Sequence, residues 1–323
     1  MRPLKFHPIL KQTLWGGERI IPYKELASGL SRVGESWELS GMPGSESVVA
    51  EGPWAGSTLS ELIGRFGAEL LGKANYARFG QEFPLLVKFI DAREDLSIQV
   101  HPDDELARKR HGKSGKCEMW YVLEAEPGAS LLTGFSRPIA PAEYERRVAD
   151  NTLTDVLNRQ AIASGDVFYL PAGRVHSIGK GSFIVEIQQS SDITYRSYDF
   201  DRRDAAGNSR ELHTELAREA IDFESSENSR ITYAPENNQE VRLVTTPYFT
   251  TSLYTLTART RCDWSATDSF VAIVLLQGSG SLTDNEGNRI DVRQGETWLL
   301  PASTQWTEIT PHTAPLRLLT SRI

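Results

Sequence analysis

The chain has 323 residues, a mass of 36.0 kDa and a formal net charge of −8 at pH 7. Hydrophobic residues make up 39% of it and charged residues 24%, as in globular rather than disordered chains. The acidic balance argues against general nucleic-acid binding, which needs a basic face. The length fits one large domain or two ordinary ones.

The two cysteines, Cys117 and Cys262, provide no disulfide framework and fit a reducing compartment. The first residues lack the apolar stretch of a signal peptide. The longest plain apolar run, residues 270–276, is too short to cross a bilayer. We therefore expect a cytoplasmic monomer or homodimer whose partner is neither a membrane nor a nucleic acid.

The first fifty residues alternate short apolar runs with Gly and Pro, which predicts strands and turns. Residues 58–80 carry apolar side chains at helical spacing, and Thr58 with a glutamate three residues later forms a candidate capping box. Helical spacing returns at residues 141–162 and 211–221. The remaining apolar runs are short and read as strands.

Two segments together carry the residues of one metal site. In the first, strand alternation puts Gln99 and His101 on one face, and Lys116 and Glu118 on another. The second segment ends at His176, after a Pro-x-Gly turn. Two imidazoles, one carboxylate and one amide oxygen can close around a single divalent ion. Zinc is the first expectation, because neutral imidazole and carboxylate suit it.

The second segment, residues 165–176, has the spacing glycine, five residues, proline, one residue, glycine, two residues, histidine. This spacing resembles the second conserved motif of the cupin family, in which a tight turn brings the histidine into a small barrel. A weaker copy begins at residues 295–301, and continuing the alignment places Trp306 opposite His176. The copy predicts a second barrel that has kept the architecture and lost the metal.

A polar stretch at residues 224–238 reads as a linker. We therefore expect a metal-binding cupin domain at residues 1–230, which includes the helical segments, and a cupin-like domain without metal ligands at residues 231–323. The expected fold is mainly β, with two cupin-like jelly-roll barrels. The first carries helical insertions, and the second is degenerate.

Six motifs follow one another along the chain: KQTLWGG at 11–17, GESWE at 34–38, IQVHPDD at 98–104, KCEMWY at 116–121, PAGRVH at 171–176 and EIQQSSDITYR at 186–196. With these motifs in this order, most of residues 1–205 resembles the type I mannose-6-phosphate isomerases, in particular the shorter bacterial form. The resemblance implies a zinc-dependent aldose–ketose isomerase acting on mannose 6-phosphate and fructose 6-phosphate. It also implies that one divalent ion is held by Gln99, His101, Glu118 and His176, and that Arg196 is the active-site arginine.

Such an isomerase moves a proton between carbons 1 and 2 through an enediol, which needs an electrophile on the sugar oxygens and a base near the carbon. Lys116 shares the face of Glu118 and fits the role of base or of phosphate anchor equally well. Arg196 can stabilise an oxyanion or bind phosphate. The candidates for substrate binding are Lys113, Trp120 and Asp192; alternation puts Trp120 on the face of Glu118 and Asp192 on the face of Arg196.

Two other functions stay open at this point. One is a non-catalytic cupin that binds a sugar or a sugar phosphate. The intact ligand set, together with Lys116 and Arg196, argues against it, because a pure binding module needs no polarising ion. The other is a different metal-dependent cupin enzyme, such as an iron dioxygenase, although such sites usually use more histidines.

Overall fold

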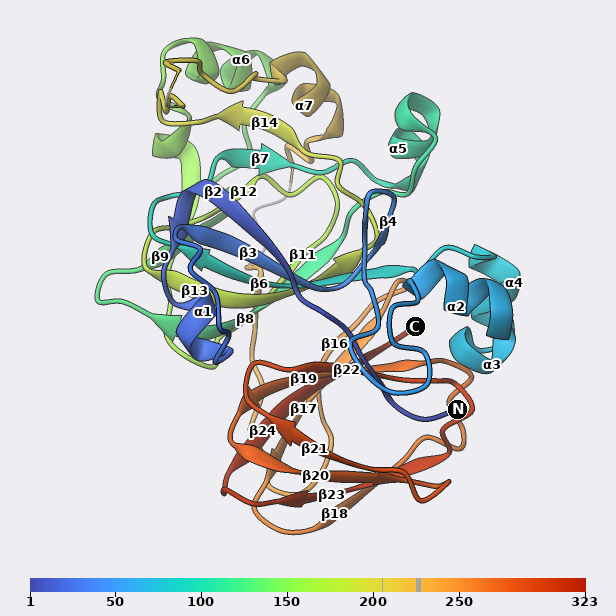
Figure 1. Ribbon diagram of the computed structural model, residues 1–323. Coiled ribbons are helices and arrows are strands. Elements are labelled where there is room, and N and C mark those ends of the chain that lie inside the picture. The colour runs from blue at the N-terminus through green and yellow to red at the C-terminus, as the bar shows by residue number, and fades with distance from the viewer. Residues whose placement is uncertain (205, 225–227) are drawn as a thin grey trace.

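The protein consists of two antiparallel β sandwiches stacked on one another, with short helices around them (Figure 1). The structure is a computed structural model and describes residues 1–204, 206–224 and 228–323. It confirms the expected mainly β fold. Among the described residues, no helix combines the length and the apolar character needed to span a membrane.

The upper sandwich in Figure 1 has a seven-stranded and a five-stranded sheet. Its strands are β2 (Ile9–Gly17), β3 (Val33–Leu39), β6 (Leu85–Ala92), β7 (Ile98–Val100), β8 (Glu118–Ala125), β9 (Ser130–Phe135), β10 (Leu157–Ala161), β11 (Val167–Leu170), β12 (His176–Ile178), β13 (Ser182–Gln189), β14 (Tyr195–Tyr198) and β15 (Arg230–Ile231). The order is β15-β11-β8-β13-β6-β2-β3 in one sheet and β10-β9-β12-β7-β14 in the other. A small separate hairpin pairs β4 (Gly41–Met42) with β5 (Ser45–Glu46).

The lower sandwich has a six-stranded and a four-stranded sheet. Its strands are β1 (Leu4–Lys5), β16 (Val241–Thr245), β17 (Thr250–Leu256), β18 (Thr260–Asp263), β19 (Val271–Gln277), β20 (Ser279–Asp284), β21 (Arg289–Arg293), β22 (Thr297–Leu300), β23 (Trp306–Pro311) and β24 (Leu316–Arg322). The order is β1-β22-β19-β24-β17-β16 in one sheet and β18-β23-β20-β21 in the other. The first strand of the chain, β1, therefore completes a sheet built from its last residues.

The two sandwiches repeat one topology. The order β11-β8-β13-β6 recurs as β22-β19-β24-β17, and β10-β9-β12-β7 recurs as β21-β20-β23-β18. Two four-stranded sheets connected in this way form a jelly roll. The repeat seen in the sequence falls at equivalent places, because Gly165 and Gly295 both have positive φ (90° and 80°) shortly before β11 and β22. His176 and Trp306 begin the equivalent strands β12 and β23.

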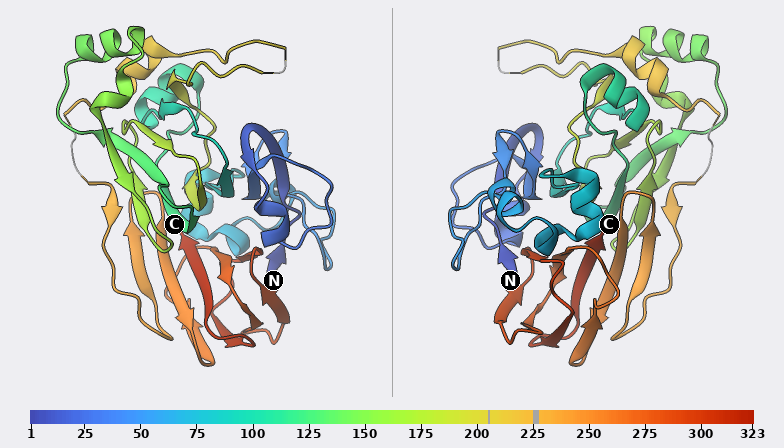
Figure 2. Two further views of the ribbon diagram at one scale, coloured as in Figure 1. Left: turned by 90° about the vertical axis from the view of Figure 1, so that its left-hand side faces the viewer. Right: turned by 90° about the vertical axis from the view of Figure 1, so that its right-hand side faces the viewer.

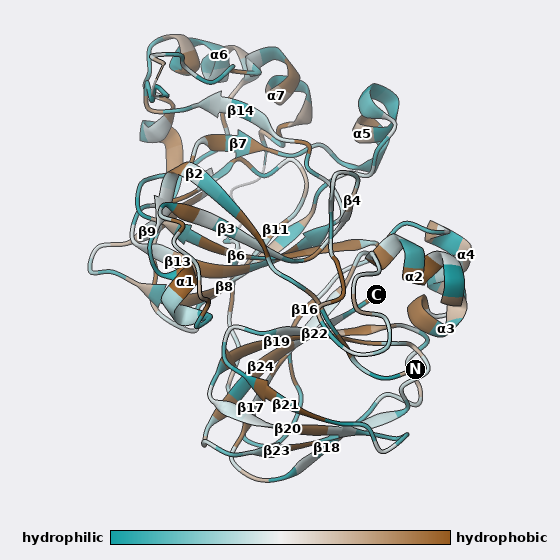
Figure 3. Cartoon of the chain, viewed as in Figure 1, coloured by the Kyte–Doolittle hydropathy of each residue, from teal (hydrophilic) through white to brown (hydrophobic). Residues whose placement is uncertain are grey.

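One hydrophobic core joins the two sandwiches, and the hydropathy view shows brown strands on both sides of their contact (Figure 3). In β13, Val185 and Ile187 belong to this shared core, whereas Glu186 between them points into the upper sandwich. Phe83 and Phe270 meet across the contact with ring centroids 4.8 Å apart. Strands such as β13 are therefore buried along their whole length, on both faces.

The helices are short: α1 (Ile20–Tyr23), α2 (Leu59–Phe66), α3 (Ala68–Leu71), α4 (Lys73–Phe79), α5 (Asp104–His111), α6 (Pro141–Ala149), α7 (Thr214–Ala220) and a 3-10 turn (Leu153–Val156). The predicted helical segment 58–80 is three helices, because Gly67 and Gly72 adopt positive φ and break it. The capping box at Thr58 is present.

The prediction of a helix through residues 141–162 is wrong in its second half. The helix ends at Ala149, and Asn151 follows with a positive φ of 56°. After the 3-10 turn, residues 157–161 form β10, which pairs with β9. The apolar residues that suggested a longer helix, Leu153 and Val156 among them, instead fill a core beneath this turn.

Two other segments differ in detail from the prediction. The helix expected at residues 211–221 is limited to α7. Within the predicted linker 224–238, residues 225–227 lie outside the described part of the chain. Beyond them, β15 pairs with β11 and so extends the seven-stranded sheet of the upper sandwich. The expected domain boundary between residues 230 and 231 therefore stays a proposal.

Candidate metal centre and active site

The four residues expected to hold a metal lie together inside the upper sandwich. Gln99 belongs to β7, and His101 follows directly after that strand. Glu118 begins β8, and His176 begins β12. Because β7 and β12 are paired, with Gln99 opposite His176, two segments separated by 77 residues bring their side chains to the same place.

The distances between these side chains fit a single small ion. Glu118 Oε1 lies 3.2 Å from His176 Nε2, and Glu118 Oε2 lies 3.5 Å from His101 Nε2. Two atoms bound tetrahedrally to zinc at about 2.1 Å would lie about 3.4 Å apart. Among the described residues, His101, Glu118 and His176 are the one such group of His, Cys, Asp and Glu, and all three are buried.

Both imidazoles are held in the state that a metal ligand needs. The Nδ1 atoms of His101 and His176 lie 2.8 Å from the carbonyl oxygens of Ile193 and Arg174 respectively, so each Nδ1–H donates to a carbonyl. Each Nε2 then carries a lone pair that faces Glu118. Burial lowers the pKa of both histidines, that of His176 to about 4, which keeps the rings neutral.

Unsatisfied atoms point to the same conclusion. Within the described part of the chain, the buried atoms His101 Nε2 and Glu118 Oε1 have no hydrogen-bond partner. Buried polar atoms are normally paired, so these atoms suit an ion between them. Gln99 Nε2 lies 3.3 Å from His176 Nε2, and turning the amide would present its oxygen instead. The Ser97 hydroxyl beside the amide can pair with either orientation.

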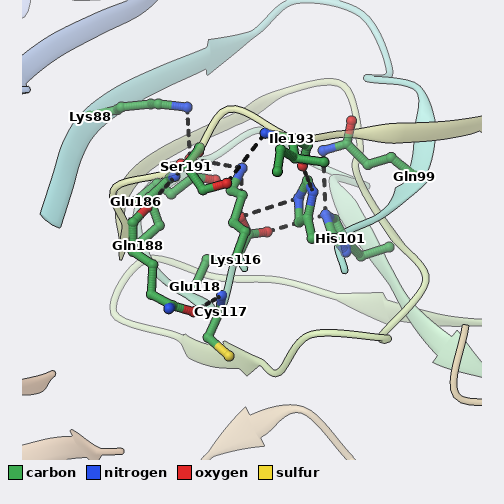
Figure 4. A network of polar contacts seen from close by, with 12 residues as sticks. Lys88, Gln99, His101, Lys116, Cys117, Glu118, Glu186, Gln188, Ser191 and Ile193 are labelled. Atoms are coloured by element: carbon green, nitrogen blue, oxygen red, sulfur yellow. Dashed lines mark hydrogen bonds and ion pairs between the residues drawn. The ribbon is translucent and has the colours of Figure 1, made fainter. Parts of the chain in front are cut away.

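A buried network of charges adjoins this group (Figure 4). Lys116 Nζ lies 3.0 Å from Glu118 Oε2 and 3.9 Å from Glu186 Oε1. Lys88 Nζ lies 3.1 Å from the same oxygen of Glu186 and 3.9 Å from Glu35 Oε2. The two lysines therefore share three carboxylates.

The network shifts the titration of its members in opposite directions. Burial raises the pKa of Glu118 to about 7, against the influence of Lys116. Burial would also raise the pKa of Glu186, but Lys116 and Lys88 outweigh it and lower that pKa to about 2. Burial would lower the pKa of Lys88, yet Glu35 and Glu186 hold it above its usual value. Both shifts favour the charged forms, so Glu186 and Lys88 form a buried ion pair.

A cavity of about 340 Å³ opens over this network. Gln99 and Lys116 line it beside the metal-binding group, and Asp192, Thr194 and Arg196 line it from β14 and the chain that leads into that strand. The expected alternation, which put Asp192 and Thr194 on the face of Arg196, agrees with this lining.

Arg196 is held by contacts that the sequence did not suggest. Its backbone N–H donates to His213 Nδ1 at 3.1 Å, and its Nη1 donates to the carbonyl of Glu211 at 2.9 Å. Both partners come from the chain between β14 and α7. This segment therefore orients the arginine from outside the sheet.

Two of the expected substrate-binding residues do not line the cavity. Trp120 is fully buried; its Nε1–H donates to Glu186 Oε2 at 2.9 Å, and its ring meets the ring of His176 at 5.4 Å. Alternation had assigned Trp120 to the correct face, but the residue lies too deep to reach a substrate. Lys113 lies half exposed at the rim, 3.0 Å from Asp192 Oδ1.

Lys88, Glu186 and Arg210 also line the cavity, and none of them was among the expected catalytic, substrate-binding or metal-binding residues. Lys88 and Glu186 face each other across the β6–β13 ladder. Each is the single charged residue inside an apolar strand run (LLVKFI and FIVEI). A charge in such a run is a signal that could have been used, because buried charges are normally paired.

Comparison with known proteins agrees with this geometry. The family model described as phosphomannose isomerase type I, catalytic domain, matches residues 4–132. The mannose-6-phosphate isomerase ManA of Bacillus subtilis is 34% identical over 303 residues, which cover 93% of each chain. The mannose-6-phosphate isomerase of Streptococcus mutans is 33% identical over 302 residues, covering 93% of this chain and 92% of that one. A crystal structure of the B. subtilis mannose 6-phosphate isomerase matches all of both chains with a TM-score of 0.90 at 30% identity. The chain therefore belongs to the type I mannose-6-phosphate isomerase family.

Proposed function

We propose that this protein interconverts mannose 6-phosphate and fructose 6-phosphate with one zinc ion held by Gln99, His101, Glu118 and His176. The observation that carries the proposal is the buried His–Glu–His group with both Nε2 atoms turned towards one carboxylate. The names of the relatives supply the substrate. When bound, the ion would polarise sugar oxygens and hold the open-chain sugar.

The side chains of the cavity would carry the proton and the charge. Lys116 Nζ, beside the ligand Glu118, would in its neutral form take the proton from one of carbons 1 and 2 and return it to the other, through an enediol. Its deep position favours this role over that of phosphate anchor. Arg196, which lines the same cavity, would stabilise the negative charge that develops on a sugar oxygen.

The donor set also bears on the competing functions. A binding module would need no group of metal-ligating residues, and the two histidines with one glutamate suit zinc. The cytoplasmic location and the monomeric or dimeric state stay predictions.

The proposal is tested with purified wild type and a His176→Gln variant. We expect the wild type to contain about one zinc per chain, to convert mannose 6-phosphate, and in deuterated water to place deuterium on carbon 2 of mannose 6-phosphate or on carbon 1 of fructose 6-phosphate. The variant should lose metal and activity together. Turnover with no solvent deuterium in either sugar phosphate, even after many turnovers at equilibrium, would contradict the enediol step. Stoichiometric iron with oxygen-dependent turnover would support the dioxygenase alternative.

A further inference from the structure

The inner end of the cavity is poorly suited to a phosphate group. Lys88 and Lys116 are the cations there, and they already face three carboxylates, Glu35, Glu118 and Glu186. A phosphate dianion placed between them would lie against these carboxylates. The two lysines and three carboxylates leave one net negative charge, and a divalent ion in the metal site would itself be shared with Glu118. The phosphate of the proposed substrate therefore needs another place.

A cluster of arginines adjoins the same cavity, and two of its members, Arg196 and Arg210, line it. Arg202 and Arg210 both approach the single buried carboxylate Asp199: Arg210 Nε lies 2.7 Å from Oδ2, and Arg202 Nη2 lies 3.5 Å from Oδ1. Arg196 is near enough for its pKa to be lowered, first by burial and then by Arg210. Arg202 and Arg210 therefore share one buried carboxylate, so this pair keeps one positive charge for an anion.

Two of these arginines have donors that the protein does not use. Among the described residues, the buried Nε of Arg196 has no hydrogen-bond partner. Arg210 contacts Asp199 through Nε and Nη2, and within the described chain its Nη1 has no hydrogen bond. Both side chains line the cavity. Guanidinium groups in this state suit the bidentate recognition of phosphate oxygens.

The order of residues along the cavity fits an extended sugar phosphate. Arg196 stands opposite Gln99 in the β7–β14 ladder and is thus next to the metal-binding group. Arg210 lines both this cavity and a second hollow of about 580 Å³ beside β2 and β3; Trp15 and Glu35 also line both. The chain between β14 and α7, which carries Arg210, reaches towards the side of the N-terminal strands (Figure 2).

We propose that Arg210 binds the phosphate group of the substrate, and that Asp199 holds the Arg210 guanidinium at the cavity for this purpose. The inference rests on the proposed function, because it needs a phosphorylated sugar whose reacting carbons lie at the metal group. It assigns the specificity for phosphorylated over free sugars to the loop between β14 and α7. Arg210 would act on binding and not on the proton transfer.

The test compares Arg210→Gln with Arg203→Gln. Arg203 comes from the same loop, but it is exposed, and its one side-chain hydrogen bond within the described residues is to the nearby carbonyl of Gly207. We expect Arg210→Gln to raise the KM for mannose 6-phosphate about 10- to 100-fold, the range typical of charge-assisted hydrogen bonds, with kcat changed less than about threefold. Titration calorimetry with inorganic phosphate should show a similar loss of affinity. Arg203→Gln should leave KM, kcat and phosphate affinity unchanged.

The outcomes separate this inference from the proposed function. If Arg210→Gln keeps the wild-type KM and phosphate affinity, the inference is overturned while the isomerase stands. If the wild type turns over no mannose 6-phosphate, the proposed function fails, and the phosphate titrations still decide whether Arg210 binds the anion. Arg210→Lys keeps the charge without the fork and serves if the glutamine variant does not fold; it should show a smaller rise in KM.

Discussion

Replacing Lys88 by methionine tests whether the buried ion pair stabilises the active-site sheet. Lys88 Nζ lies 3.1 Å from Glu186 Oε1, and both side chains are more than nine-tenths buried. Methionine keeps much of the aliphatic chain and removes the charge. Glu186 then retains Lys116, whose Nζ is 3.9 Å from the same oxygen.

The two distances set the expected magnitude. At an effective dielectric constant of about 20, an ion pair at 3.1 Å contributes about 5 kcal/mol and one at 3.9 Å about 4 kcal/mol. The substitution thus removes roughly half of the attraction on Glu186, and the desolvation cost of the lysine is recovered. Breaking a buried pair typically costs about 3–5 kcal/mol. We expect a loss at the lower end, about 3 kcal/mol in the free energy of unfolding.

The assay is urea unfolding of the wild type, Lys88→Met and the double variant Lys88→Met/Glu186→Gln, followed by tryptophan fluorescence. The double variant should recover about 1 kcal/mol or more, because a neutral amide is less costly to leave unpaired than a carboxylate. The exposed Lys180 provides the control, and Lys180→Met should change stability by less than about 0.5 kcal/mol. A loss below about 1 kcal/mol for Lys88→Met, or a double variant less stable than the single one, would refute the reasoning.

Three further predictions concern other parts of the molecule. Trp120→Phe should lower the free energy of unfolding by about 1.5–3 kcal/mol, through loss of the hydrogen bond to Glu186, and leave the KM unchanged; a raised KM with unchanged stability would speak for substrate contact. Thr58→Ala removes the cap of α2 and should cost about 1 kcal/mol in urea unfolding; no change would mean that the cap is redundant. Burial raises the pKa of Cys262 to about 11 and also raises that of Cys117, so both thiols stay protonated at pH 8. A thiol reagent should then label two cysteines in denaturant and none in the native protein, and rapid native labelling would contradict this.

The ligand group could be predicted because its information is local. Alternation along a strand fixes the relative face of Gln99 and His101, and the Pro-x-Gly turn fixes the start of β12 at His176. The same rule gives the face of Trp120 but not its depth, which depends on what packs above it in the folded sandwich. The Lys88–Glu186 pair could not be derived in this way, because it depends on the register between two strands far apart in sequence.

The fold shows a similar division. The two copies at Gly165 and Gly295 were recognisable because a positive-φ glycine leads into each equivalent strand. The end of α6 could not be recognised from the sequence. Apolar residues at helical spacing also occur in a 3-10 turn followed by an edge strand, as they do here. The pairing of β1 with β22 in the second sandwich could not be predicted either. A strand of two residues has no sequence pattern that indicates its partner strand.

The central claim is that a metal held by the His–Glu–His group makes this protein an isomerase of mannose 6-phosphate. The most direct measurement strips the protein of metal with a chelator, removes the chelator, and follows conversion of mannose 6-phosphate while zinc is titrated back. The account predicts no turnover in the stripped protein and a rise in rate that ends at about one zinc per chain. Full turnover by the stripped protein, or none after zinc is restored, would contradict it.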